Sequence, residues 1–216
     1  MAKETRRRAR VIVVGTDFGA ESKNALRRAL DIATESRARV HVVHVTPRIP
    51  RTVARMFSLA VDRKLRDKLA GVTDKLRDAG IQATAHLAQG DVVKGLTIKA
   101  RVLAADLVIV GARGRAVPDT MIGSTAERLV ALDQHRVLLV RGPAGRAYER
   151  VLIAASEESN LREQVRAAEL FTVDPPSVLH VYEGPFESAL VAHGVPASDI
   201  GKYRAAARRQ AELRMA

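Results

Sequence analysis

The fold is decided by one stretch, LVIVGARG at residues 107–114, which is followed by GSTAERL at residues 123–129. Its first four residues are apolar without alternation, which is typical of a strand buried on both faces of a parallel sheet. Glycines follow directly, and a helical pattern begins after the second glycine motif. Glycine lets a backbone approach a phosphate, and the first N–H groups of a helix have no internal partners. The stretch therefore predicts either a site for the phosphates of a nucleotide, with ATP as our main hypothesis, or a well-capped connection that binds nothing.

The flanking sequence alternates continuous apolar runs, which predict strands, with apolar residues at helical spacing. We predict strands at residues 11–14, 40–45, 81–87, 107–110 and 137–140, and helices at residues 22–36, 53–78, 91–104 and 124–132, with Ser22 capping the first helix. This alternation implies parallel pairing and right-handed crossovers, and therefore an α/β fold with a five-stranded parallel sheet between helices. Ligands of such sheets bind beyond the carboxyl ends of the strands. Asp17 and Gly111 both follow a strand end, so we expect them on one rim.

After a short linker, GPAG at residues 142–145, the pattern restarts. RVLIAASE at residues 150–157 lies over RVIVVGTD at residues 10–17, and VLHVY at residues 178–182 echoes VVHV at residues 42–45. This internal repeat predicts two domains, residues 1–143 and a partial second copy at residues 149–216 that ends in a helix at residues 203–215. Glu157 stands in the place of Asp17 and no glycine loop follows. We therefore expect the second copy to be a packing or dimer element without a ligand site.

Composition limits the function classes. The 216 residues contain no cysteine, which excludes disulfides and cysteine-based zinc sites. No apolar run is long enough to span a membrane and no secretion signal opens the chain, so we expect no membrane partner and a cytoplasmic location. The net charge of +12 would attract polyanions, but aromatic residues make up only 3% of the chain and tryptophan is absent. A base-stacking nucleic-acid binder is therefore not expected.

Motifs for catalysis or metal binding are missing from the sequence. His41 and His44 lie three residues apart on a predicted strand, which puts their side chains on opposite faces, so we expect no metal site there. Neither the phosphate loop of strong NTPases nor the nucleophile elbow of hydrolases occurs. No acid and base are paired for catalysis. We therefore predict a protein that is not an enzyme, with at most slow, incidental ATP hydrolysis.

Four short motifs together resemble the universal stress protein family: VGTDF at residues 14–18, HV at 44–45, GARG at 111–114 and GST at 123–125. The resemblance covers about residues 8–142, and the tail resembles the start of a second, tandem-type domain. It implies a Rossmann-like sheet of the adenine nucleotide alpha hydrolase-like type, with a C-terminal βαβα half-repeat. It also implies a role in stress response, homodimers joined through the last strand, and two subclasses, of which only one binds ATP.

In the binding subclass the resemblance implies ATP as the ligand, with or without Mg²⁺. Asp17 would contact adenine or ribose, and the backbone at Val45 would contact adenine. Gly111 would approach the ribose. The phosphates would be held by Gly114, Gly123, Ser124 and Thr125. The implied ligand-binding positions are Gly15, Thr16, Asp17, Val45, Gly111, Arg113, Gly114, Gly123, Ser124 and Thr125. One departure is the span from Arg115 to Ile122, which has eight residues where the family pattern has nine. The alternative reading is a nucleotide-free dimeric scaffold that acts through protein–protein contacts.

Overall fold

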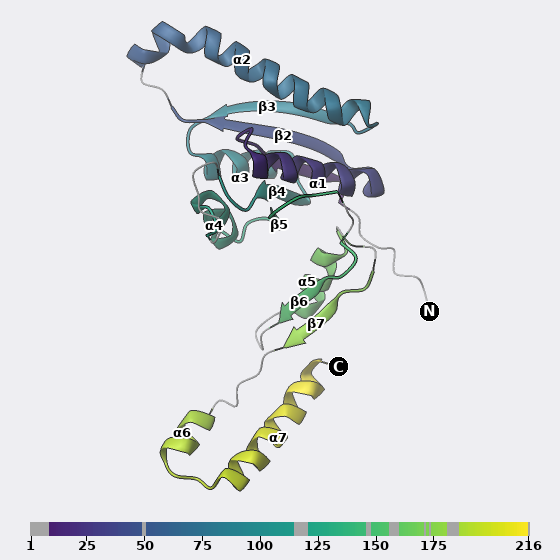
Figure 1. The fold of residues 1–216 in the computed structure, drawn as a ribbon, viewed down its shortest axis with the longest axis vertical. Helices are drawn as coiled ribbons and strands as arrows, with labels where there is room; N and C mark the ends of the chain where they lie inside the picture. Colours follow the sequence, from purple (N-terminus) through teal and green to yellow (C-terminus); the bar gives the residue numbers. More distant parts are fainter. Residues whose placement is uncertain are drawn as a thin grey trace. The chain divides into compact units, whose positions relative to one another are not determined.

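The computed structural model describes residues 9–48, 51–114, 121–145, 148–155, 160–170, 172, 174–180 and 186–215, leaving aside the side chains of residues 51–62, 211, 214 and 215. The chain divides into two units, Met1–Tyr148 and Glu149–Ala216, which are described separately (Figure 1). In the described part, no helix has both the length and the apolar character needed to cross a membrane.

The first unit contains the predicted parallel sheet of five strands, in the order β3-β2-β1-β4-β5. Its strands are β1 (Val11–Gly15), β2 (Arg39–Thr46), β3 (Ala83–Gln89), β4 (Leu107–Gly111) and β5 (Val137–Val140). The chain moves outward from β1 to β3 and then crosses back to β4, so β1 and β4 flank the switch in strand order. Asp106 joins these two strands at their amino ends, because its Oδ2 accepts the backbone N–H groups of Arg10 and Val11.

Four helices cover the sheet: α1 (Ala20–Ser36), α2 (Arg51–Asp78), α3 (Val92–Val102) and α4 (Ser124–Ala131). Figure 1 shows α2 running alongside β3 and β2, with which it is in contact. Residues of α3 and α4 share one core cluster with Val13, Val43 and Val110 of the sheet. The next residue along β4, Gly111, faces α1 instead. Because side chains alternate along a strand, α1 and α3 lie on opposite faces.

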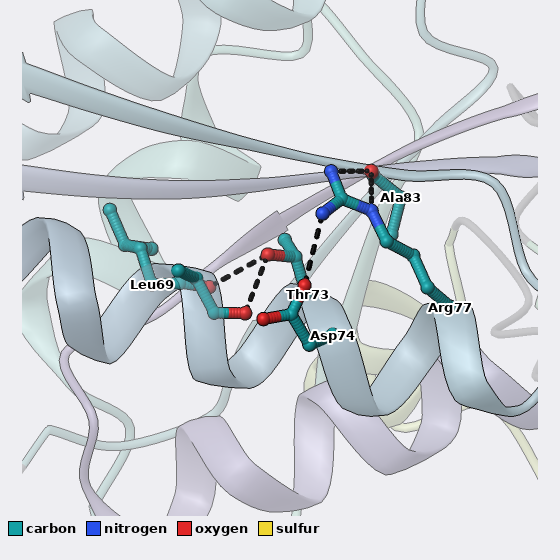
Figure 2. Close-up of polar contacts among 6 residues, drawn as sticks. Leu69, Thr73, Asp74, Arg77 and Ala83 are labelled. Carbon is teal, nitrogen blue, oxygen red and sulfur yellow. Dashed lines mark hydrogen bonds and ion pairs between the residues drawn. The ribbon is translucent and has the colours of Figure 1, made fainter.

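The end of α2 is tied to the start of β3 by side chains (Figure 2). Arg77 donates from Nε and Nη2 to the carbonyl oxygen of Ala83 at 3.0 and 2.8 Å, and from Nη1 to Asp74 at 3.0 Å. One turn earlier, the buried Thr73 hydroxyl hydrogen-bonds to the carbonyl of Leu69. Gly80, with φ of +81°, adopts the left-handed conformation that ends helices, as the sequence predicted. These contacts fix where β3 begins.

In the first unit, two predicted starts of elements were wrong. Ser22 does not cap α1, because the helix already begins at Ala20 with Gly19 as its cap residue, and the Ser22 hydroxyl donates to the Gly19 carbonyl. The third strand begins at Ala83 and not at residue 81, because Ile81 still belongs to the closing turn of α2, where its N–H bonds to the Leu76 carbonyl.

The second unit contains β6 (Leu152–Ala155) and β7 (Ser177–His180), paired in parallel, with α5 (Leu161–Ala168) between them. It continues into α6 (Glu187–Ala192), which the sequence did not predict, and α7 (Ala197–Met215), which begins six residues before the predicted helix. His180 Nδ1 lies 2.9 Å from the Ala155 carbonyl, as His44 Nδ1 lies 2.7 Å from that of Thr16. These contacts put Ala155 in the place of Thr16, one residue off the sequence overlay. Glu157 lies outside the described residues.

Candidate functional site

One cavity of about 200 Å³ opens beyond the carboxyl ends of β1, β2 and β4. All ten positions that the resemblance implied line this cavity, although they come from four separate parts of the chain. The resemblance assigned no ligand contact to the other lining residues, which are Ser22, Val43, His44, Val92, Leu96, Val110, Ala112 and Ala126. Most of these are apolar, and a sequence pattern assigns apolar residues to the core before it assigns them to a binding surface.

The inner wall of the cavity is apolar and closely packed. Val43, Val45, Leu96 and Val110 belong to the core cluster under α3 and α4. A Cβ atom at Gly15 would lie 3.0 Å from Val110 Cγ1 and 3.1 Å from Leu96 Cδ1. Glycine at this position therefore lets the two side chains approach the end of β1. The wall provides a dry surface against which a flat ring could pack.

The turn after β1 holds Thr16 and Asp17 in fixed orientations. The Thr16 hydroxyl accepts the Phe18 N–H at 3.0 Å and donates to Ser22 Oγ at 3.2 Å. Asp17 Oδ1 accepts the N–H of Gly19 at 2.8 Å. This Asx-type contact orders the carboxylate at the cavity rim before any ligand arrives, and it engages one of the two carboxylate oxygens.

His44 is a lining residue with a defined tautomer. Its Nδ1 lies 2.7 Å from the Thr16 carbonyl oxygen, which can only accept, so Nδ1 carries a proton and Nε2 of the neutral ring is an acceptor. The ring lies against Phe18, with centroids 4.7 Å apart and planes tilted by 43°. The histidine thus connects the end of β2 to the turn after β1. Its position near the end of the second predicted strand, beside Val45, was the signal that could have found it.

Another part of the cavity lining is the amino terminus of α4. Its cap residue, Gly123, offers no side-chain partner, and Ser124 and Thr125 place hydroxyl groups in the first turn. The N–H groups of a first helical turn carry a partial positive charge and favour anions. Asp91 ties this helix to α3, because it caps α3 through the Lys94 N–H and accepts from Arg128 of α4 at 3.1 Å. The Lys94 N–H and the Arg128 guanidinium lower the pKa of the Asp91 carboxyl.

Gly123 and Gly111 serve packing more than the resemblance implied. The Gly123 N–H donates to the Ala112 carbonyl at 2.8 Å, so this donor is already used within the chain. A Cβ at Gly123 would lie 3.3 Å from Arg113 Cα. A Cβ at Gly111 would lie 2.8 Å from Glu21 Cβ, so glycine is needed here for α1 to approach β4. A Cβ added at Gly114, by contrast, would meet nothing within 4 Å.

Arg113 lies at the edge of the cavity in a largely buried ion pair. Its Nη2 is 3.0 Å from Glu21 Oε1, and the two side chains are 12% and 19% exposed. Glu21 therefore offsets much of the charge that Arg113 could present to an anion. The shortened span from Arg115 to Ile122, with Pro118, lies mostly outside the described residues, since residues 115–120 are not among them.

Of the histidines considered for metal binding, His41 pairs with His86 of β3 and not with His44. Among the residues whose placement is described, no group of three or more histidine or acidic side chains could hold a metal ion.

A five-stranded parallel sheet with its cavity at the switch in strand order defines a doubly wound α/β protein. The chain belongs to the universal stress protein family, whose family model matches residues 8–141. No curated protein is significantly similar to the chain.

Solved structures show the same fold at low sequence identity. A universal stress protein family member from Burkholderia pseudomallei is 24% identical, with 61% of this chain and 96% of that chain covered and a TM-score of 0.52. The universal stress protein UspA from Lactobacillus plantarum is 19% identical, with 62% and 99% covered and a TM-score of 0.56. A universal stress protein in complex with cAMP is 23% identical, with 62% and 98% covered and a TM-score of 0.50.

Proposed function

We propose that the cavity binds an adenine nucleotide, and that ATP acts there as a regulatory ligand in stress response. One observation carries the proposal: the ten positions implied by family resemblance line a single cavity whose lining includes both an apolar wall and a helix amino terminus. A relative of the same fold was solved in complex with cAMP, which supports an adenine nucleotide as the ligand class.

The chemistry of each wall suits one part of such a ligand. The adenine ring would pack against the apolar wall that contains Val45 and Leu96, and a ribose hydroxyl would donate to Asp17. The phosphates, with or without Mg²⁺, would accept hydrogen bonds from Ser124 and Thr125 in the first turn of α4. In this arrangement the cavity binds and orients a nucleotide, and the proposed role is regulation, not catalysis. The proposal also places the protein in the cytoplasm as a homodimer joined through β5.

The alternative function is a nucleotide-free scaffold, and two observations favour it. The Gly123 N–H and Arg113 already have partners inside the chain, at Ala112 and Glu21. Large apolar side chains are also exposed on the outer surfaces of α3 and α4, including Ile98 at 50%, Val102 at 71% and Val130 at 51%. A scaffold would act through such surfaces and would show no nucleotide dependence.

Calorimetric titration with ATP separates the two functions. Saturable binding is expected, and Gly114→Val should weaken it by about tenfold or more, because the new side chain would occupy open space beside the phosphates. Gly71→Val is the matched control, since a Cβ at Gly71 also meets nothing within 4 Å but lies in α2, away from the cavity. Flat titrations up to millimolar ATP would instead support the scaffold, and equal affinities for the two variants would place bound ATP outside this cavity.

A further inference from the structure

A second hollow, of about 460 Å³, lies at the amino-terminal ends of β2 and β3. It is therefore at the opposite end of the strands from the first cavity. Its polar lining comes from Arg39, His41, Arg77, Gln82 and Thr84, and none of the described lining residues is acidic. Arg77 is already engaged by the Ala83 carbonyl and by Asp74, so its charge is offset locally. Arg39 and His41 are the two lining groups that could act on a ligand.

His41 forms a hydrogen-bonded pair with His86 on the neighbouring strand. His41 Nδ1 and His86 Nε2 are 3.1 Å apart, and the ring centroids are 5.3 Å apart. The parallel register sets Val43 opposite His86, so both histidines share the face of the sheet that α3 covers. The pair is half-buried between β2, β3 and α3.

The charged groups that act on this pair are all positive. Burial lowers the pKa of both histidines, and Arg39 of β2 and Lys99 of α3 lower that of His41 further. For His86 the further causes, after burial, are Lys99 and His41 itself. Within the described part of the chain, neither Arg39 nor Lys99 has an ion-pair partner. Among the residues whose side chains are described, the cluster of Arg39, His41, His86 and Lys99 therefore has no acidic counter-ion.

The number of protons on the pair sets how many N–H donors it presents to an anion. Two neutral imidazoles carry two protons on four nitrogens, and one of these protons lies in the hydrogen bond between the rings. Only one outer nitrogen is then a donor. One added proton makes both outer nitrogens donors and keeps the bond, whereas a second added proton would break it. The singly charged pair is therefore the form that an anion would favour.

We propose that the hollow binds a small tetrahedral oxyanion, such as sulfate or a phosphate group, against Arg39 and His41, and that binding loads one proton onto the His41–His86 pair. The site is separate from the proposed nucleotide cavity and does not depend on it. Charge-assisted hydrogen bonds from a guanidinium and an imidazolium are the usual means of holding such anions. The oxyanion supplies the counter-ion that the cluster lacks.

Calorimetric titration with sodium sulfate tests the proposal, because sulfate does not itself titrate near neutral pH. The full chain is titrated at pH about 7, in two buffers with different heats of ionisation, so that protons taken up by the protein are counted. We expect saturable binding, with an uptake that approaches one proton per sulfate. Affinity should rise as the pH is lowered toward about 6, where the pair is more readily charged.

Three variants locate the site. Arg39→Gln should weaken sulfate binding by about tenfold, because it removes one charge-assisted contact. The double variant His41→Gln, His86→Gln removes both titrating rings, so proton uptake should disappear even if Arg39 still holds some sulfate. Arg63→Gln is the matched control, since it removes the same charge from an exposed position on α2 and should change neither quantity.

Several results would overturn the proposal. These are the absence of saturable sulfate binding, equal affinity in Arg39→Gln and Arg63→Gln, or proton uptake that persists in the double variant His41→Gln, His86→Gln. Loss of sulfate binding in Gly114→Val, with no effect of Arg39→Gln, would place the anion at the start of α4. That result would leave the nucleotide proposal standing and remove this one.

Discussion

The two strand–helix–strand segments of the molecule, β1–α1–β2 and β6–α5–β7, share a local design but differ in burial. In both, a histidine of the second strand hydrogen-bonds to a backbone carbonyl at the end of the first strand. His44 bonds to Thr16, one residue past β1, and His180 bonds to Ala155, the last residue of β6. These contacts make Leu152 the counterpart of Val13, yet Leu152 is 61% exposed and Val13 is fully buried. Strand pairing is therefore encoded locally, whereas burial on both faces depends on elements that come later in the chain.

The difference arises from β4, α3 and α4. In the first unit, β4 pairs with β1, and the two helices cover the face that carries Val13 and Val43. Leu179, the counterpart of Val43, is 46% exposed in the second unit. We propose that this unit is a partial second copy of the first. Its apolar face marks where the missing half of a complete domain would pack.

The largest expected effect is on core packing and tests this difference directly. Leu107→Ala, at a β4 side chain that is 2% exposed, should lower the free energy of unfolding by about 3 kcal/mol, from lost burial and the cavity left behind. Leu152→Ala makes the same chemical change in β6 and should lower it by less than about 1 kcal/mol. Denaturant unfolding of the full chain measures both. Equal losses would mean that Leu152 is covered in solution.

The second expected effect concerns glycines, and it tests whether Gly111 is required for α1 to pack against β4 beside the cavity. Gly111→Ala would place a Cβ 2.8 Å from Glu21 Cβ and 2.9 Å from its backbone carbon, which forces α1 away from β4. We expect a loss of about 1–3 kcal/mol in thermal or chemical unfolding, with weaker ATP binding. Gly71→Ala, in open space on α2, should instead stabilise the protein by about 0.5–1 kcal/mol. If Gly111→Ala is neutral, then α1 does not approach β4 this closely.

The sequence predicted the architecture because its signals are local. The apolar run before Gly111 identifies a doubly buried strand, and Gly80 identifies the end of a helix. The partner of His41 could not be predicted in the same way, because His86 lies 45 residues further on and meets it only through the register of β2 and β3. The start of α1 was placed at Ser22 because a serine before an apolar run resembles a cap.

The candidate site was predictable as a set of positions but not as a set of roles. The glycine motifs mark where the backbone is crowded, and the structure shows that Gly111 makes room for α1 while the Gly123 N–H bonds to Ala112. From sequence alone, a glycine required by neighbouring protein cannot be distinguished from one required by a ligand. Likewise, the pairing of Arg113 with Glu21 joins residues 92 positions apart.

A third prediction compares the two histidine contacts. His44→Ala removes a hydrogen bond and the stacking on Phe18, and should lower the free energy of unfolding by about 1 kcal/mol. It should also weaken ATP binding several-fold, because it frees the turn that carries Asp17. His180→Ala removes the equivalent bond in the second unit and should leave ATP binding unchanged. Calorimetry and unfolding of both variants provide the test, and equal effects on ATP binding would contradict the assignment of the cavity to the first unit alone.

The smallest expected effect is a pH dependence that belongs to the first unit, since Ser177 occupies in β7 the place that His41 occupies in β2. The pKa values of His41 and His86 are lowered in the folded protein, so the unfolded chain binds more protons near and below pH about 6.5. Stability should therefore be constant above that pH and fall as the pH drops toward about 5.5. His86→Gln should flatten this slope in unfolding curves recorded without sulfate or phosphate, because one of the two titrating rings is gone. An unchanged slope in His86→Gln would assign the pH dependence to other groups.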